Sequence, residues 1–255
     1  MKVAISTENL NDCCETESAL NRLHEFGVDT AEVYLKTFYE YRPEFAKSIA
    51  PNICGVYVPF VRGFSLNFEG NMFNSSRRVR GDGLYWFDQI LRSAKILRSD
   101  NYIFRGTCVD ETNIDCISRA VRETYDFCAS YGVNILLENS HYGIYSKPET
   151  FSKIRERVPS LWGVLNMAES RTAGYPIGMY LAHMSGAIAA VRISDVDKSG
   201  KICLPGEGCL NFKDILHRLY DGGFEGSLII DTVKGADKDR LKHCVENVKE
   251  LIYIL

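Results

Sequence analysis

Two acidic residues and three arginines each stand at the end of a short run of β-forming residues in this 255-residue sequence. The acidic residues are Glu138 and Asp231, and the arginines are Arg62, Arg105 and Arg192. A partly buried carboxylate can act as a general acid or base, which makes Glu138 and Asp231 candidate catalytic residues. Arginine keeps its proton at any ordinary pH and can bind a phosphate or carboxylate through paired hydrogen bonds. The pattern predicts acid/base chemistry on a small polar ligand, or binding of an anionic one.

Further polar residues follow the same runs and extend the candidate binding site. We expect the residues that contact a ligand to be Arg62, Arg105, Asn139, His141, Asn166, Glu169, Arg192 and Glu207. Each has a structural alternative, because a charge at a strand end can be solvated or paired with an opposite charge. His141 fits a solvent-facing loop equally well. Glu207 fits a turn in which the glycines on either side supply positive φ.

Eight runs of β-forming residues, separated by roughly 30 residues, indicate the scaffold that must position these side chains. The predicted strands cover residues 3–6, 31–35, 53–61, 101–105, 134–138, 163–166, 190–194 and 227–231. Amphipathic stretches between them predict helices over residues 15–26, 83–97, 112–131, 148–157, 211–220 and 238–254. Strands that alternate with helices along the whole chain are typical of βα units.

Eight βα units in ~250 residues predict an α/β protein with a single (β/α)8 TIM barrel, in one domain that spans residues 1–255. The carboxyl ends of the strands would then bring the candidate residues to one pocket. A doubly wound open sheet is the alternative, but the loop Thr7-Glu8-Asn9-Leu10 after the first strand lacks a G-x-G-x-x-G nucleotide motif. Residues 60–80 are predicted to form a long loop that covers the active site.

Six segments, in order along nearly the whole chain, carry a family resemblance. They are Ala31-Glu32-Val33-Tyr34-Leu35, residues 64–69, 102–107 and 136–139, Leu204-Pro205-Gly206-Glu207-Gly208 and residues 226–231. No single motif is very specific, but the ordered set resembles the sugar phosphate isomerase/epimerase family. These are the xylose isomerase-like TIM barrels, which include DNA repair enzymes of the endonuclease IV type. The resemblance implies a barrel whose mouth handles a small carbohydrate.

The same resemblance implies a divalent metal (Zn, Mn or Mg), held by Glu, Asp, His and Glu after the fifth to eighth strands. These roles fall on Glu138, Asn166, Arg192 and Asp231, so only Glu138 is unchanged. Arginine has no lone pair to donate, and asparagine offers a neutral carbonyl at best. Two carboxylates are fewer than the three or four protein ligands of a usual catalytic metal site. We therefore expect a degenerate site that binds no metal, and no other cofactor.

Charge and composition exclude several classes of protein. Thirty Lys and Arg against 33 Asp and Glu give a net charge of -3, which does not favour nucleic acid as a partner. No run approaches the ~20 apolar residues of a membrane span, and the first ten residues do not resemble a signal peptide. The sequence has nine cysteines but no C-x-x-C motif, which argues against a structural zinc site or a disulfide framework. These features predict a cytoplasmic protein with no membrane or nucleic-acid partner.

Three functions remain open at this stage. The first is an isomerase or epimerase of a small carbohydrate, with Glu138 as the acid/base and the arginines as electrostatic groups. The second is a non-catalytic barrel that binds a carbohydrate-like or anionic ligand. The third, DNA repair of the endonuclease IV type, is disfavoured because its multi-metal cluster would keep only Glu138 here.

Overall fold

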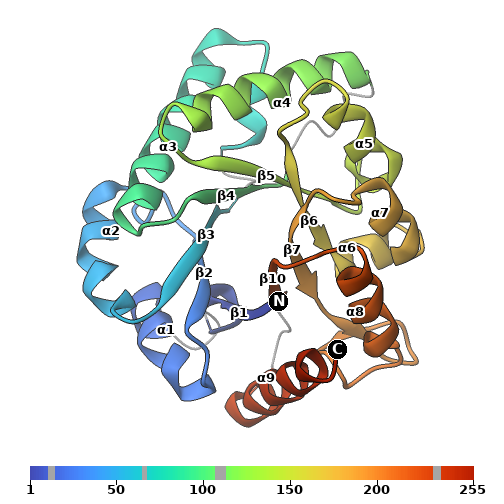
Figure 1. Ribbon diagram of the computed structural model, residues 1–255. Helices are drawn as coiled ribbons and strands as arrows, with labels where there is room; N and C mark the ends of the chain where they lie inside the picture. The colour runs from blue at the N-terminus through green and yellow to red at the C-terminus, as the bar shows by residue number, and fades with distance from the viewer. Residues whose placement is uncertain (11–14, 65–67, 107–112, 232–236) are drawn as a thin grey trace.

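Eight parallel strands close into a barrel in the computed structural model, which describes residues 1–10, 15–64, 68–106, 113–231 and 237–255 (Figure 1). The strands are β1 (Lys2–Ser6), β2 (Thr30–Leu35), β3 (Tyr57–Gly63), β4 (Asn101–Phe104), β5 (Asn134–Glu138), β6 (Trp162–Asn166), β7 (Ile188–Ile193) and β10 (Ser227–Ile230). Strand β10 closes the ring by pairing with β1, with Ser227 opposite Lys2. The predicted (β/α)8 TIM barrel is confirmed. The alternative of an open sheet is wrong, because an open sheet has no such closing pair.

Helices surround this barrel (Figure 1). They are α1 (Thr16–Arg22), α2 (Pro43–Ile49), α3 (Arg77–Ile96), α4 (Ile114–Ala129), α5 (Glu149–Arg155), α6 (Met167–Thr172), α7 (Ile177–His183), α8 (Phe212–Asp221) and α9 (Lys238–Tyr253). The six predicted helices correspond to α1, α3, α4, α5, α8 and α9 with shifted ends, and the predicted start at residue 112 lies outside the described residues. Within the described residues, no helix is long and apolar enough to cross a membrane.

The sequence prediction missed three short helices and one small hairpin. Helices α2, α6 and α7 contain seven, six and seven residues. Two turns are too few to display the i, i+3, i+4, i+7 spacing on which helix prediction depends. The hairpin pairs β8 (Asp195–Val196) with β9 (Ile202–Cys203) outside the barrel sheet.

The predicted bounds of the third strand and of the loop after it were wrong. Ile53, the first residue of the predicted strand, is the last residue of a 3-10 helix, Ala50–Ile53, and β3 starts only at Tyr57 and continues to Gly63. Both ends of the predicted loop over residues 60–80 are regular structure, because its first residues belong to β3 and α3 begins at Arg77. Between them, Gly70–Phe73 form a 3-10 helix, and residues 65–67 lie outside the described residues. The strand extends this far because Arg62 and Gly63 continue the parallel pairing with Tyr34 and Leu35 of β2.

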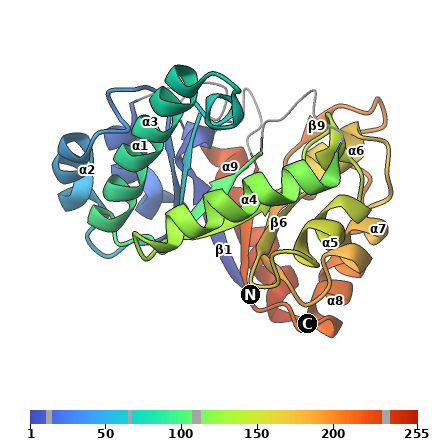
Figure 2. The same ribbon diagram turned by 90° about the horizontal axis from the view of Figure 1, so that it is seen from above.

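The two ends of the barrel differ in what they carry. Figure 2 shows both chain termini at the end of the barrel where the strands begin. The opposite end, formed by the carboxyl ends of the strands, is the mouth of the barrel and holds most of the candidate residues. This is the end at which TIM barrels place their active sites.

Candidate functional site

The barrel interior is built in layers, because alternate residues of a strand face the same side. An apolar layer consists of the buried residues Ala4, Phe60, Ile103, Leu136, Val164, Ala190 and Ile229. Two residues further along the same seven segments come Ser6, Arg62, Arg105, Glu138, Asn166, Arg192 and Asp231. The spacing of two therefore gathers polar side chains in the next layer, at the mouth.

Arg192 is the central cation of this polar layer and is fully buried. Its Nη2 donates to both carboxylate oxygens of Glu32, at 2.7 and 2.8 Å, and its Nη1 donates to Oδ1 of Asp231 at 3.0 Å. Its Nε lies 3.3 Å from Oε1 of Glu138. Three carboxylates from three different strand segments thus converge on one guanidinium group.

Arg62 is likewise engaged on several sides. It forms an ion pair with Glu8, and its Nε lies 3.4 Å from Oε1 of Glu32. The guanidinium carbon also lies 4.5 Å from the centre of the Tyr34 ring, a cation–π distance. The residue is only 6% exposed. Arg62 is at the mouth, as predicted, but its charge is already paired with carboxylates of the chain.

Arg105 forms the accessible edge of the cluster. Its Nη2 is paired with Glu169, and its Nε lies 3.9 Å from Oε2 of Glu138. Glu169 also accepts from the backbone N–H of His141 at 2.7 Å and contacts the imidazole Nδ1 at 2.6 Å. The side chains of Arg105 and His141 are 20% and 45% exposed, so this is the part of the cluster that a ligand can reach.

Two asparagines orient the acidic residues. The side chain of Asn166 donates to Oε1 of Glu138 at 2.7 Å, and its carbonyl oxygen caps α6 by accepting from the N–H of Glu169. Asn139 bonds the Asn166 backbone in both directions, at 2.6 and 3.1 Å. Both asparagines use their polar atoms within the protein, so they position Glu138 and Glu169.

Glu138 is a buried anion rather than a strong base. Burial alone would raise the pKa of its carboxyl group, but Arg192, Arg105 and Arg62 together outweigh burial and hold the pKa below its ordinary value. A carboxylate with a lowered pKa has a lower affinity for a proton and is a weaker general base. Its Oε2 is buried and has no hydrogen-bond partner among the described residues.

Sequence reasoning missed three acidic residues. Glu8 and Glu32 pair with the mouth arginines. A third, Glu69, lies fully buried and accepts from the Tyr102 hydroxyl at 2.6 Å and from the Arg105 backbone N–H at 3.1 Å. Burial raises the pKa of Glu69 to about 7. Glu32 could have been found from its alternate-residue spacing within β2, whereas no local signal marks Glu69.

Glu207 is a candidate that the structure does not bring into the arginine cluster. Its carboxylate pairs instead with Arg240 of α9, at 2.7 Å, and accepts from the backbone N–H of Leu204. The Arg240 guanidinium lowers the pKa of the Glu207 carboxyl group. Gly206 has a φ of 90°, in agreement with the alternative that this segment is a turn.

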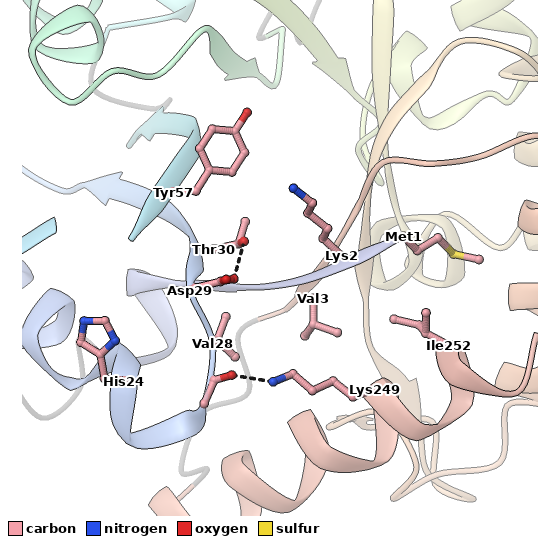
Figure 3. Close-up of a pocket in the computed structure, with 11 residues that line it drawn as sticks. Met1, Lys2, Val3, His24, Val28, Asp29, Thr30, Tyr57, Lys249 and Ile252 are labelled. Atoms are coloured by element: carbon pink, nitrogen blue, oxygen red, sulfur yellow. Dashed lines mark hydrogen bonds between the residues drawn. The ribbon is translucent and has the colours of Figure 1, made fainter. Parts of the chain in front are cut away.

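A cavity lies at the opposite end of the barrel. This cavity of about 530 Å³ is lined by residues such as Lys2, His24, Tyr57 and Lys249 (Figure 3). Lys249 donates to the Gly27 backbone carbonyl, and Lys2 lies over the Tyr57 ring at 5.5 Å. The cavity lacks the convergent carboxylates and guanidinium groups of the mouth, which therefore remains the candidate site.

A model of the xylose isomerase-like TIM barrel family matches residues 20–251. The chain belongs to this family. Its structure is similar to a D-tagatose 3-epimerase-like protein (TM-score 0.82, 19% identity, covering 100% of this chain and 98% of that one). It is also similar to the D-psicose 3-epimerase of Clostridium cellulolyticum H10 (TM-score 0.77, 14% identity, 100% and 99% covered) and to an L-ribulose 3-epimerase (TM-score 0.77, 15% identity, 99% and 95% covered). No curated protein matches the sequence. At these identities the structural similarity establishes the fold.

The described side chains at the mouth of this xylose isomerase-like barrel do not form a ligand set for a divalent metal. Among the residues that the structure describes, no three His, Cys, Asp or Glu side chains are arranged to hold a metal ion. The guanidinium of Arg192 lies between Glu32, Glu138 and Asp231, where it takes up the carboxylate oxygens that a metal would need. A cation fixed at this point would also repel a metal ion.

Proposed function

We propose that the mouth of this barrel binds a small carbohydrate, as in a sugar isomerase or epimerase, but without a divalent metal. The location is supported by the convergence of polar side chains at the carboxyl ends of the strands. The ligand class is supported by the names of similar structures, which include epimerases of tagatose, psicose and ribulose. The observation that carries the metal-independent part is the seating of Arg192 on Glu32, Glu138 and Asp231.

Binding without turnover is the form of this proposal that the geometry favours. Epimerisation would need a base to remove a proton from carbon and a cation to stabilise the resulting enediolate. Arg192 is buried and committed to three carboxylates, and Glu138 has a lowered pKa. Neither group is well suited to that step, whereas the accessible edge formed by Arg105, Glu169 and His141 can hold a polar ligand.

Catalysis by Glu138 is the second candidate, and one observation favours it. The Oε2 atom of Glu138 is buried and has no hydrogen-bond partner among the described residues, so its lone pairs are not engaged by the protein. Arg105 lies next to it and could stabilise negative charge on the same ligand. The residues then have the roles expected from the sequence, with a guanidinium as the electrostatic group.

Metal-depleted protein provides the test. We would dialyse the protein against a chelator, measure its metal content, and titrate it with free ketoses and aldoses by calorimetry. Binding of a sugar by metal-free protein, unchanged when Mn²⁺ or Zn²⁺ is added, is the expected result. Stoichiometric metal at the mouth, with sugar binding that disappears on its removal, would contradict the proposal.

The Glu138→Gln variant then separates binding from turnover. If any isomerisation is detected by NMR, loss of the rate in this variant supports Glu138 as the base. An unchanged rate removes it from that role. The matched control is Glu207→Gln, because Glu207 is paired with Arg240 outside the arginine cluster.

A further inference from the structure

Two buried polar atoms face each other at the mouth without a hydrogen bond between them. Oε2 of Glu138 and Nε of Arg105 are 3.9 Å apart, and neither has a hydrogen-bond partner among the described residues. A buried acceptor or donor without a partner is costly, so such atoms usually bind a water molecule or a ligand group. One oxygen placed about 2.8 Å from each atom would satisfy both.

We propose that this gap between Glu138 and Arg105 is a subsite for one hydroxyl group of a neutral polyhydroxylated ligand. A hydroxyl can donate its hydrogen to the Glu138 carboxylate while its oxygen accepts from the Arg105 N–H, which no anionic oxygen can do. The proposal deepens the proposed function, because it names the charge class of the carbohydrate and one of its contacts.

The charges around the subsite support a neutral ligand over a phosphorylated one. Three guanidinium groups are paired with five carboxylates, which belong to Glu8, Glu32, Glu138, Glu169 and Asp231. Each guanidinium group already holds at least two of these carboxylates. A phosphate would therefore have to displace a carboxylate from an arginine, and that carboxylate would lose its buried partner.

The proposed subsite lies beside the accessible edge of the arginine cluster. Arg192 and Glu138 are fully buried, whereas Arg105 is 20% exposed and adjoins Glu169 and the exposed ring of His141. A ligand entering from this side meets Glu169 and His141 first. Because both atoms of the gap are closed to solvent, these two side chains have to shift before a hydroxyl group of the ligand reaches it.

A free sugar and its phosphate ester, compared as ligands, test whether the site prefers a neutral carbohydrate. D-fructose and D-fructose 6-phosphate would be titrated into the metal-free protein by calorimetry, as the first probes of a panel of free and phosphorylated sugars. We expect every bound free sugar to bind at least about tenfold more tightly than its phosphate ester. A tighter phosphate ester overturns the inference and leaves the carbohydrate proposal intact. Failure of all sugars overturns both.

A ligand with one hydroxyl replaced by hydrogen tests the contact itself. For a sugar that binds, each single deoxy analogue would be compared with its parent in wild type and in Arg105→Met. One analogue should lose about tenfold or more in affinity with wild type, and this loss should shrink to about twofold or less with Arg105→Met. The control is Arg218→Met, which removes an exposed arginine paired with Asp214 on α8 and should leave the loss unchanged.

Two outcomes of this comparison of deoxy analogues would contradict the proposed subsite. An equal loss in wild type and in Arg105→Met means that Arg105 does not contact that hydroxyl and contradicts the subsite. If no deoxy analogue loses affinity, only water occupies the gap and the inference fails. If Arg105→Met does not fold, Arg105→Leu, which likewise has no N–H to donate to the ligand hydroxyl, takes its place with the same expectation.

Discussion

Nη2 of Arg192 lies within hydrogen-bond distance of both carboxylate oxygens of Glu32, in a pair that is buried from solvent on both sides. The two residues are far apart in the chain and come from β7 and β2, on different sides of the barrel. Buried ion pairs gain little when both partners are present, but loss of one partner leaves an uncompensated charge. The pair therefore makes the mouth a single electrostatic unit that ties opposite walls of the barrel together.

Arg192→Met should destabilise the protein by about 3–5 kcal/mol, because Glu32, Glu138 and Asp231 all lose a buried cation. Denaturant unfolding followed by circular dichroism measures the change. Arg218→Met, which removes an exposed ion pair, is the control and should change stability by no more than about 1 kcal/mol. Similar losses in the two variants would show that Arg192 does not hold the mouth together.

Glu69 should make stability fall as pH rises. Its pKa is raised from 4.5 to about 7 in the folded protein, so its contribution is fully present below about pH 4.5 and is lost as pH rises through 7. Glu69→Gln removes this dependence. The stability of the variant relative to wild type should therefore increase by roughly 3 kcal/mol between pH 4.5 and pH 8. A difference between the two proteins that stays constant over this range would refute the buried, protonated state of Glu69.

Glu138 should show the opposite dependence. Because the three arginines lower its pKa in the folded protein, its ion pairs contribute fully above about pH 4.5 and are lost as pH falls through the lowered value. The advantage of wild type over Glu138→Gln should be constant from neutral pH down to about pH 5 and should shrink below pH 4.5. Chemical unfolding at a series of pH values measures it. An advantage that instead grows as pH falls from 7 to 5 would mean that the pKa of Glu138 is raised in the folded protein.

A double variant should rebuild a metal site of the kind that the family resemblance implies. Asn166→Asp combined with Arg192→His supplies a third carboxylate and an imidazole beside Glu138 and Asp231, which gives four ligands suited to Mn²⁺ or Zn²⁺. We expect the double variant to bind one divalent ion per chain and to gain thermal stability with it. Asn166→Asp alone, with Arg192 in place, should bind none. Metal uptake by wild type or by that single variant would show that Arg192 does not exclude the ion.

The sequence predicted the barrel because its signals repeat along the chain. Eight β-forming runs with helices between them leave few arrangements, and seven of the polar residues at their ends do converge at the mouth. The site residues that the prediction overlooked are those whose place depends on tertiary contacts. Glu32 lies in the middle of β2, so reading only the strand ends overlooked it, and Glu69 reaches Tyr102 from a loop whose course no local pattern fixes.

The partners of the arginines were the least predictable feature. Arg62, Arg105 and Arg192 could bind an anion or pair with carboxylates of the chain, and their residue types alone do not distinguish these states. The distances between guanidinium nitrogens and carboxylate oxygens distinguish them, because each guanidinium contacts at least two carboxylates of the chain. Glu207 was predicted to lie at the pocket because of its glycine-flanked motif. Its carboxylate instead forms an ion pair with Arg240, which is distant in sequence.

The spacing of two between the apolar and polar layers has a consequence for how such a barrel can change. Residues such as Phe60 and Leu136 hold the strands together, and the chemistry of the mouth belongs to Arg62 and Glu138, one step further along the same strands. The reactive layer can therefore be exchanged, by natural variation or by an engineer, while the layer beneath continues to close the ring. The residues at the mouth of such a barrel can therefore change while the fold is retained.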